Sequence, residues 1–357
     1  MPWTERDREA LVEHMRELGL HGVKIMEVCG THTMAIAKAG IRSMLPDGVE
    51  LLSGPGCPVC VAPPEEIDGF LQLSSEKNII IASYGDMLRV PGSRRGDSLL
   101  RRRAMGAQVE IVYSPVDAVE LAQAQPEKQV VFLGVGFETT APGTAAAVLT
   151  AREKGIKNFS VWPMLKMVEP ALRALIEAPG FEVKGFICPG HVASVIGAEG
   201  FRFLPREYGL PGVVAGFEPE EILTAIGELL DMIASGKADV INCYPRAVRL
   251  EGNPLARQMI KNCFEAEDGL WRGLGAIPGS GLGFKEELKD FDARRRFELA
   301  PLKAAESPCR CGDVICGRLS PENCPLFGRN CTPADPVGPC MVSSEGACAA
   351  AYKYRGI

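Results

Sequence analysis

The chain has 357 residues, a formal net charge of −6, and 46% hydrophobic against 24% charged residues. This composition predicts a folded globular protein of two or three domains and excludes a disordered chain. The negative charge also argues against nucleic acid as a partner, although Arg94, Arg95 and residues 101–103 form one local basic patch.

The N-terminal residues 1–19 have the pattern of a charged amphipathic helix and lack the apolar core of a signal peptide. No apolar run in the sequence approaches the roughly 18 residues that suggest a membrane-spanning helix. We therefore expect a cytoplasmic protein with no membrane segment.

From residue 20 to about residue 240, apolar runs rich in β-branched residues alternate with helical patterns. Strands are expected at residues 23–29, 78–85, 109–115, 130–137, 159–164, 185–190 and 213–217. Helices are expected from Thr31 onward and at residues 117–125, 141–155, 168–179, 193–201 and 218–233. Such alternation predicts βαβ crossovers, so we expect an α/β protein with two doubly wound domains built on parallel sheets.

We divide this stretch near residue 125, in a polar segment, because it holds more strands than one small sheet needs. The predicted domains are residues 1–125, 126–240 and 241–357. Past residue 240 the pattern weakens into a glycine-rich stretch and a charged helix at residues 285–299. The terminal segment has too many Pro and Gly residues for a conventional core, so we expect a metal to order it.

Five motifs follow predicted strands: EVCGTH, LLSGPGCPVC, GVGFETT, CPGH and AGFE. Two of them share a short repeat, because Gly-Phe-Glu occurs at residues 136–138 and again at residues 216–218. In open α/β sheets the ligand site lies beyond the carboxyl ends of the strands. We therefore expect these motifs to converge on one site.

Cys29 and His32 belong to the first of these motifs, at a turn from strand to helix. Free backbone N–H groups and the helix dipole at such a turn lower the pKa of a thiol and favour the thiolate. The spacing could place both side chains near one face of the first helical turn. The alternative is that Cys29 is a small buried residue and His32 or Thr31 caps the helix.

Cys57 and Cys60 form a C-x-x-C sequence in a turn fixed by glycines and Pro58. This spacing permits a reversible disulfide or two ligands to one metal. A closed four-cysteine zinc site is not expected, because no second C-x-x-C at usable spacing lies nearby. A purely structural role is the alternative.

Glu138 and His191 complete the set of candidate side chains at strand ends. The Gly134-x-Gly136-x-x-Thr pattern resembles a phosphate-binding loop, but its third glycine is missing and Glu138 would repel phosphate. Glu138 is a candidate acid, base or hydrogen-bond acceptor, or else only an acid at a helix N-terminus. His191 is a candidate ligand or proton-transfer group, or else a helix cap.

Thirteen cysteines in a cytoplasmic chain indicate metal ligands, redox thiols or core residues rather than a disulfide framework. Seven lie in about the last fifty residues: Cys309, Cys311, Cys316, Cys324, Cys331, Cys340 and Cys348. Four of these, Cys311, Cys324, Cys331 and Cys348, are spaced x12, x6 and x16. Four thiolates can hold a tetrahedral zinc ion or a [4Fe-4S] cluster, and the spacing does not decide between them. Cys309, Cys316 and Cys340 are possible substitutes as ligands.

Taken together, the motifs resemble the HypD family from end to end. The resemblance rests on EVCGTHTMAIAKAGI, GPGCPVCVAP, YGDMLRVPG, VYSPVDAVELA, GVGFETTAPGT, PGHVASVIG, VAGFEP, WRGLG, CPLFG and MVSSEGACAAAYKY. It implies two α/β domains and a C-terminal iron-sulfur domain with a [4Fe-4S] cluster. The cluster thiolates would be those of Cys311, Cys324, Cys331 and Cys348, with Cys309 an open alternative to Cys311. The cleft cysteines would be Cys29, Cys57 and Cys60.

The resemblance further implies a maturation factor for [NiFe]-hydrogenases, a scaffold on which the Fe(CN)2CO unit is assembled with HypC and HypE. Ferrous iron that carries CN and CO is soft, so the thiolate of Cys29, with Cys60 or a HypC cysteine, suits it as a ligand. His32, Glu138 and His191 would position or protonate groups around this iron. Electrons would pass from the cluster through the Cys57 and Cys60 dithiol to the iron.

Two functions of other classes also fit the sequence. An iron-sulfur thiol-disulfide oxidoreductase acting on a small substrate would use the C-x-x-C pair and a cluster. A zinc-stabilised binding module without redox chemistry would need only the C-terminal cysteines and would be colourless when purified without oxygen.

Overall fold

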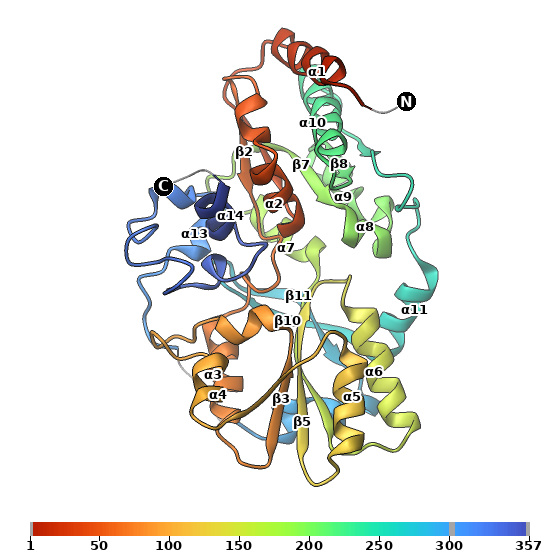
Figure 1. Ribbon diagram of the computed structural model, residues 1–357. Helices are drawn as coiled ribbons and strands as arrows, with labels where there is room; N and C mark the ends of the chain where they lie inside the picture. Colours follow the sequence, from red (N-terminus) through yellow and green to blue (C-terminus); the bar gives the residue numbers. More distant parts are fainter. Residues whose placement is uncertain (1–2, 300–303, 355–357) are drawn as a thin grey trace.

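The computed structural model describes residues 3–299 and 304–354, so the first two residues of the predicted N-terminal helix lie outside the described residues. Two parallel sheets, with helices between successive strands, occupy opposite ends of the molecule (Figure 1). The prediction of an α/β fold with parallel sheets is confirmed.

The upper sheet in Figure 1 has five parallel strands in the order β2-β1-β7-β8-β9. The strands are β2 (Val49–Ser53), β1 (Val23–Glu27), β7 (Val183–Pro189), β8 (Gly212–Ala215) and β9 (Val240–Asn242). Helices α1 (Glu5–Glu17), α2 (Gly30–Lys38) and α10 (Pro219–Ala234) contribute to a core with this sheet, in which Met15, Ile25, Ile36 and Ile226 are fully buried.

The lower sheet has four parallel strands in the order β4-β3-β5-β6. The strands are β4 (Gln108–Ile111), β3 (Ile79–Ser83), β5 (Gln129–Gly136) and β6 (Phe159–Leu165). Every residue of β3 and β6 is buried. This agrees with sequences that are almost continuously apolar rather than alternating, because a parallel sheet is covered on both faces. Helices α5 (Pro115–Ala124) and α6 (Ala141–Glu153) pack with one face.

The chain order of the strands does not follow the predicted division near residue 125. The upper sheet joins strands from residues 23–53 with strands from residues 183–242, and the lower sheet is formed by residues 79–165. A cut at residue 125 would therefore separate β4 from β5, both of which pair with β3. The sheets are discontinuous in sequence because the chain leaves the first sheet after two strands and returns to it later.

Residues 254–296 pack mainly on the lower sheet. The glycine-rich segment forms an antiparallel hairpin of β10 (Phe264–Trp271) and β11 (Gly275–Phe284), which was not predicted. The predicted helix at residues 285–299 is only partly present, as a 3-10 turn over Glu286–Phe291 followed by the short α12 (Ala293–Arg296). A bridge between Val161 and Asp292 fixes this segment beside β6, which explains why the helix is interrupted.

The remaining helices complete the layers. They are α3 (Pro64–Leu73), α4 (Leu99–Ala104), α7 (Val168–Ile176), α8 (Gly190–Ile196), α9 (Phe203–Tyr208), α11 (Pro254–Cys263), α13 (Cys311–Ile315) and α14 (Ala347–Tyr354). None of the helices within the described residues has both the length and the apolar character needed to cross a membrane.

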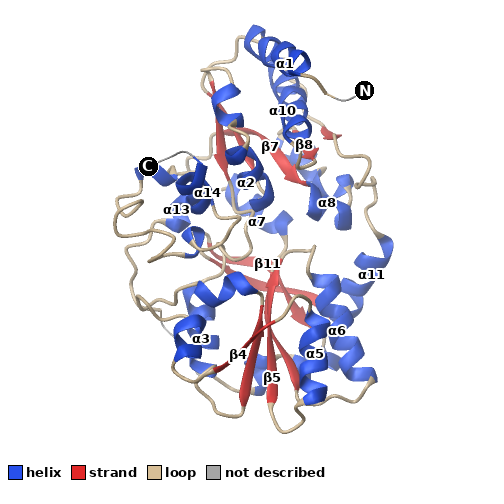
Figure 2. Ribbon diagram, viewed as in Figure 1, coloured by secondary structure: helices blue, strands red, loops and turns tan. Residues whose placement is uncertain are grey.

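The cysteine-rich C-terminal segment is mostly loop, with α13 and α14 as its regular elements (Figure 2). It is not separate from the protein core, because Cys311, Cys331, Cys340 and Cys348 belong to the same buried cluster as Trp271 of the hairpin and residues of both parallel sheets. Helix α14 packs against α2 beside the upper sheet. The segment therefore lies at the joint between the two sheets (Figure 1).

Candidate functional site

The carboxyl ends of strands from both sheets meet at one cavity of about 280 Å³. We call this cavity the cleft. Its walls come from the residues after β1, β3, β5 and β7 and from the C-x-x-C loop, and they include Cys29, Thr31, Gly56, Pro58, Tyr84, Asp86, Phe137, Thr140, His191 and Glu345. The predicted convergence of the strand-end motifs is confirmed, because four of the five line the cleft and the fifth packs directly behind it.

Cys29 lies in the cleft wall at the N-cap position of α2, with 6% of its surface exposed. Its backbone N–H donates to Glu27 at 3.0 Å, and Gly30 N–H donates to the carbonyl of Gly56 at 3.1 Å. A Cβ on Gly56 would lie 2.1 Å from the Cys29 nitrogen, so only glycine lets the C-x-x-C loop approach this closely. The two cysteine motifs are thus held against each other.

The predicted lowering of the Cys29 pKa is wrong for the metal-free chain. Burial, with a smaller contribution from the charges of Glu27 and Glu345, raises the pKa of the Cys29 thiol to about 12. Hydrogen bonds from the backbone of the first helical turn act in the expected direction but do not outweigh desolvation. Cys29 is therefore a protonated thiol until a cation replaces its proton, as happens when a metal binds a thiol.

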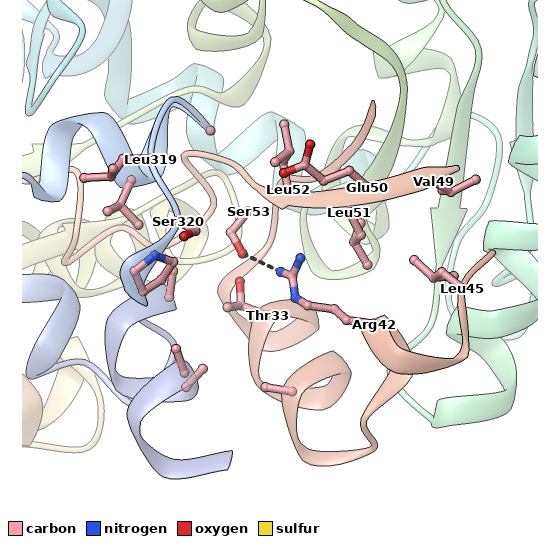
Figure 3. A pocket seen from close by; sticks show the side chains of 17 residues that line it. Thr33, Arg42, Leu45, Val49, Glu50, Leu51, Leu52, Ser53, Leu319 and Ser320 are labelled. Atoms are coloured by element: carbon pink, nitrogen blue, oxygen red, sulfur yellow. Dashed lines mark hydrogen bonds between the residues drawn. The ribbon is translucent and has the colours of Figure 1, made fainter. Parts of the chain in front are cut away.

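Glu27 is a fully buried carboxyl group beneath this turn. It accepts hydrogen bonds from the Thr33 hydroxyl at 2.6 Å and from Cys29 N–H, and burial raises the pKa of Glu27 to about 7. Thr33 also lines a second cavity of about 280 Å³ between β2, α2 and α14. In that cavity Arg42 donates to Ser53 at 2.9 Å (Figure 3). This second cavity shares no lining residue with the cleft and has no cysteine in its wall.

The two candidate histidines lie on either side of Phe217, from the second Gly-Phe-Glu sequence. The ring centroid of Phe217 is 4.1 Å from that of His191 and 4.8 Å from that of His32. His32 is fully buried, its Nε2 lies 2.8 Å from the Gly216 carbonyl, and burial lowers its pKa to about 4. His191 is exposed to the cleft, and partial burial lowers its pKa. Only His191 can reach a ligand in the cleft.

Glu138 points away from the cleft and is buried. One of its oxygens accepts from Val168 N–H at 2.9 Å, at the first residue of α7, and the other has no partner among the described residues. Burial raises the pKa of Glu138 to about 7. This geometry favours the alternative of a carboxyl group at a helix N-terminus, although the helix is not the one that follows it in sequence.

Cys57 and Cys60 do not line the cleft but face the C-terminal segment. Cys60 N–H donates to the sulfur of Cys57 at 3.2 Å, and the Cys57 thiol donates to the Ser343 hydroxyl at 3.4 Å. The thiol of Cys60 is fully buried and contacts the thiols of Cys57 and Cys340. Burial is the main cause of the raised pKa of Cys60.

Five sulfur atoms form a continuous series of contacts from the C-x-x-C loop into the C-terminal segment. We call it the thiol chain, and its members in spatial order are Cys57, Cys60, Cys340, Cys311 and Cys309. The sulfurs of Cys311 and Cys340 lie 2.7 Å apart. All thirteen cysteines of the protein are free thiols in this structure. The sequence did not predict this series, because Cys340 lies 280 residues from Cys60 in the chain.

Six cysteines surround a small cavity in the C-terminal segment, and we call them the cysteine centre. They are Cys309, Cys311, Cys324, Cys331, Cys340 and Cys348, and the rest of the wall is largely apolar, with Leu326, Phe327 and Met341. A Cβ on Gly338 would lie 2.2 Å from the sulfur of Cys309. Glycine at this position therefore leaves space for that thiol.

The cysteine centre has the donor atoms that an iron-sulfur cluster needs. Within the described residues, no group of three or more His, Cys, Asp or Glu side chains is arranged to hold one metal ion. In an iron-sulfur cluster each thiolate binds a different iron, so the four sulfurs lie farther apart than the ligands of one ion. The donor set of thiols in an apolar wall fits such a group.

Several side chains at the site were not identified from the sequence. Glu345 and Ser343, in the loop between Cys340 and Cys348, reach from the C-terminal segment to the two cysteine motifs. Thr31 donates to Glu345 at 2.7 Å, and Ser343 accepts from Cys57. Tyr84 and Asp86 also line the cleft. The sequence signal for these last two was their place at the carboxyl end of the strand predicted at residues 78–85.

Comparison with known proteins gives consistent results over nearly the whole chain. The family model HypD, described as "Hydrogenase formation hypA family", matches residues 7–355. The Escherichia coli (strain K12) "Hydrogenase maturation factor HypD" is 44% identical over 354 residues, which cover 97% of this chain and 94% of that protein. The Azotobacter vinelandii protein of the same name is 45% identical over 338 residues, 93% of this chain and 89% of that protein. The "Hydrogenase expression/formation protein HupD" of Azotobacter chroococcum mcd 1 is also 45% identical, with the same coverage.

Proposed function

The chain belongs to the HypD family of hydrogenase maturation factors, and we propose that it is the scaffold on which the Fe(CN)2CO unit is assembled with HypC and HypE. The observation that supports this proposal is the position of Cys29. Its thiol faces a cavity large enough for a small metal complex, and the neighbouring C-x-x-C loop connects to a second group of cysteines. We propose that this assembly takes place in the cytoplasm, where cysteines stay reduced.

We propose that Cys29 anchors the iron, which here is the substrate carried by the protein. Coordination replaces the thiol proton, so a thiol whose pKa is about 12 becomes a thiolate ligand only when the iron arrives. Thiolate suits ferrous iron that carries CN and CO. A second ligand from Cys60 is not supported by its position, because Cys60 is buried away from the cleft. A cysteine of HypC is the better candidate.

The other cleft residues would act on the ligands of the iron. His191 is exposed to the cavity and can donate or accept a proton there. Glu345 and Asp86 place carboxyl groups in the same wall. His32 and Glu27 would instead hold the turn that carries Cys29, because their hydrogen bonds are to Gly216 and to the residues of that turn.

We propose that the cysteine centre holds a [4Fe-4S] cluster, whose chemistry is the transfer of single electrons. Cys324, Cys331 and Cys348 are proposed as ligands. We propose Cys309 rather than Cys311 as the fourth ligand. The Cys311 sulfur lies 2.7 Å from that of Cys340, which also contacts Cys60 and Cys348. Cys311 and Cys340 are then free to act as a dithiol, which releases two electrons and two protons when it closes to a disulfide. The thiol chain would carry reducing equivalents between Cys309 and Cys57.

Infrared spectroscopy of the complex with HypC tests the anchor. Cys29→Ser should remove the CN and CO stretching bands and leave the iron and sulfide content of the C-terminal segment unchanged. Cys243→Ser is the control, since Cys243 also lies at the end of a strand of the upper sheet but outside the cleft. Bands of full intensity in Cys29→Ser would show that the iron is held elsewhere.

Iron and sulfide analysis of anaerobically purified variants tests the cluster ligands. Cys309→Ser, Cys324→Ser, Cys331→Ser and Cys348→Ser should each lose most of the cluster absorption. Cys311→Ser should keep the cluster but fail to reduce a disulfide between Cys57 and Cys60. Loss of the cluster in Cys311→Ser with retention in Cys309→Ser would reverse the assignment, and a colourless wild-type protein would contradict the cluster itself.

A further inference from the structure

The surface around α4 has a charge opposite to that of the whole molecule. Residues 89–103 contain six arginines and one aspartate, a net charge of +5 in a chain whose net charge is −6. We call this region the α4 surface and define it by its exposed side chains: Arg89, Arg94, Arg95, Leu100, Arg101, Arg103 and Met105. This local positive charge makes the α4 surface a candidate binding site for a negatively charged partner.

Only some arginines of the α4 surface form ion pairs or hydrogen bonds with other residues of the protein. Arg95 pairs with Asp335 and Arg101 donates to the carbonyl of Gly96. Arg94 and Arg103 have no ion pair among the described residues. The only acid within residues 89–103, Asp97, is already bound to Arg102, so most of the positive charge faces solvent.

Two exposed apolar side chains lie among these charges. Leu100 is 49% exposed and Met105 is 75% exposed. Arginine and methionine are enriched, and lysine depleted, where proteins bind other proteins. The net charge of −6 of the whole chain argues against nucleic acid as the partner. The combination therefore favours an acidic protein as the partner.

The α4 surface touches the loop that joins Cys331 to Cys340. Arg89 donates to the carbonyl of Pro333, and Arg95 pairs with Asp335 at 2.6 Å. Figure 1 shows α4 below the blue C-terminal segment on the same side of the molecule. Cys324 and Cys309 are the partly exposed members of the cysteine centre. A protein that docks on the α4 surface would therefore lie beside the cysteine centre.

We propose that the α4 surface docks an acidic iron-sulfur protein of the ferredoxin type, which delivers electrons to the cysteine centre. The proposal rests on the proposed cluster. In each encounter the reduced carrier loses one electron and the oxidised centre gains it. Two encounters supply the two electrons that, with two protons from solvent, open one disulfide to two thiols. Weak, small interfaces steered by opposite charge are typical of electron-transfer partners.

Stopped-flow absorbance with a reduced acidic ferredoxin measures this reaction in the cluster-loaded full-length protein. The double variant Arg94→Glu and Arg103→Glu should lower the second-order rate at low ionic strength at least tenfold, since steering of this kind changes rates by about 10- to 1,000-fold. The wild-type rate should fall as salt is added and the variant rate should not. These two arginines are chosen because neither makes an ion pair whose loss would disturb the fold.

The matched control is Lys154→Glu with Lys157→Glu, which makes the same change in net charge on the exposed end of α6, distant from α4 in Figure 1. Reduced ferredoxin should reduce this control variant at close to the wild-type rate. Both double variants should keep wild-type iron content and should be reduced equally fast by a neutral photoreduced deazaflavin. Equal rates with ferredoxin for the α4 variant and wild type would overturn the proposal.

A binding measurement separates this proposal from the cluster proposal. The apo-protein should bind oxidised ferredoxin in low salt, and the Arg94→Glu and Arg103→Glu variant should bind it at least tenfold more weakly. If wild type never holds a cluster but this difference is found, docking stands and the proposed cluster fails. If a redox-inert acidic protein or a single-stranded RNA competes equally well near physiological salt, the surface is a general anion site and the proposal is wrong.

Discussion

Gly338 controls the space available to Cys309. A methyl group at residue 338 would lie 2.2 Å from the Cys309 sulfur, so Gly338→Ala has to displace that thiol or the loop that carries residue 338. We expect the variant to lose at least half of its iron and sulfide, and to lose about 1–3 kcal/mol of stability from overpacking. Elemental analysis and urea unfolding under anaerobic conditions measure the two effects.

Gly143→Ala is the control for this substitution. Its new methyl group would have ordinary contacts of 3.8 Å or more, and residue 143 lies within α6. Alanine should therefore leave the iron content unchanged and stabilise the helix by about 0.5–1 kcal/mol. A full complement of iron in Gly338→Ala would show that Cys309 is not a ligand with a fixed position.

Glu138 gives the stability of the protein a predictable pH dependence. Burial raises its pKa from an ordinary 4.5 to about 7, so the folded chain binds a proton that the unfolded chain has released. Its contribution to stability is therefore fully present below pH 4.5 and is lost as the pH rises to about 7. The size of the loss is about 3 kcal/mol. In Glu138→Gln this loss should disappear, while the acceptor for Val168 N–H is kept.

Urea unfolding of the apo-protein at several pH values between 4.5 and 8 checks this expectation. The quantity to compare is the change in unfolding free energy across the range, in wild type and in Glu138→Gln. Other groups, including Glu27, titrate in both proteins and cancel in the comparison. The exposed Glu153→Gln should follow wild type. Parallel pH profiles for Glu138→Gln and wild type would mean that Glu138 is not a buried proton-binding group.

At the scale of elements, the turn of the β10–β11 hairpin joins the C-x-x-C region to the cysteine centre. Arg272 donates from its backbone N–H to Val61 and from its side chain to the carbonyl of Ala62, each at 2.9 Å. The next residue, Gly273, has φ +81° and packs against the backbone of Gly312, beside Cys311. The hairpin therefore fixes the distance between the two groups of thiols.

Gly273→Ala should weaken the contact between the hairpin turn and Gly312. Its methyl group would lie 2.4 Å from the Gly312 Cα, and its positive φ adds strain. Gly279→Ala in the same hairpin is the control, since residue 279 has φ +63° with no atom within 4 Å of the new methyl group. We expect the control to cost about 1–2 kcal/mol from backbone strain alone. Gly273→Ala should cost more and should speed amide exchange across residues 309–324, whereas equal exchange in the two variants would contradict the bridging role.

At the scale of the whole molecule, the two sheets have conventional apolar cores and the C-terminal segment has little regular structure of its own. We expect removal of the proposed cluster to leave both sheets folded and to increase amide exchange mainly within residues 309–348. Loading should raise the unfolding temperature of this segment, because the binding free energy adds to its folding free energy. Hydrogen exchange of apo- and loaded protein measures both. Uniform exchange changes throughout both sheets would contradict this expectation, because the cluster would then stabilise the whole molecule.

The sequence predicted the elements that depend on local pattern. The α/β alternation identified most strands, and the charged amphipathic pattern of residues 1–19 predicted a helix that the structure contains as α1. The hairpin at residues 264–284 was missed, because its glycines carry no strand pattern and the pairing depends on contacts with β6 and α7. The charged helix at residues 285–299 is interrupted because Asp292 forms a bridge to the lower sheet.

The sequence also located the site, because parallel strands place the residues that follow them at one edge of a sheet. Cys29 and His191 are in the cleft as this rule predicts. The rule does not say how deeply a side chain is buried. The direction predicted for the Cys29 pKa was wrong for this reason, because the helix dipole was considered without the burial that outweighs it. Nor could the rule show that His32 and Glu138 point away from the cavity, because that depends on which neighbours pack against each turn.

By itself, the sequence determined the fold class, the family and the thiols available for chemistry, because these follow from local patterns and from motifs with fixed spacing. The tertiary structure alone decided which thiols meet. Cys340 is distant in the chain from Cys60 and Cys311, yet its sulfur contacts both. The same is true of the two sheets, whose strands are interleaved in the chain. Long-range packing of apolar faces sets these contacts. The periodic pattern of an apolar face predicts that it is buried, but not which other face covers it.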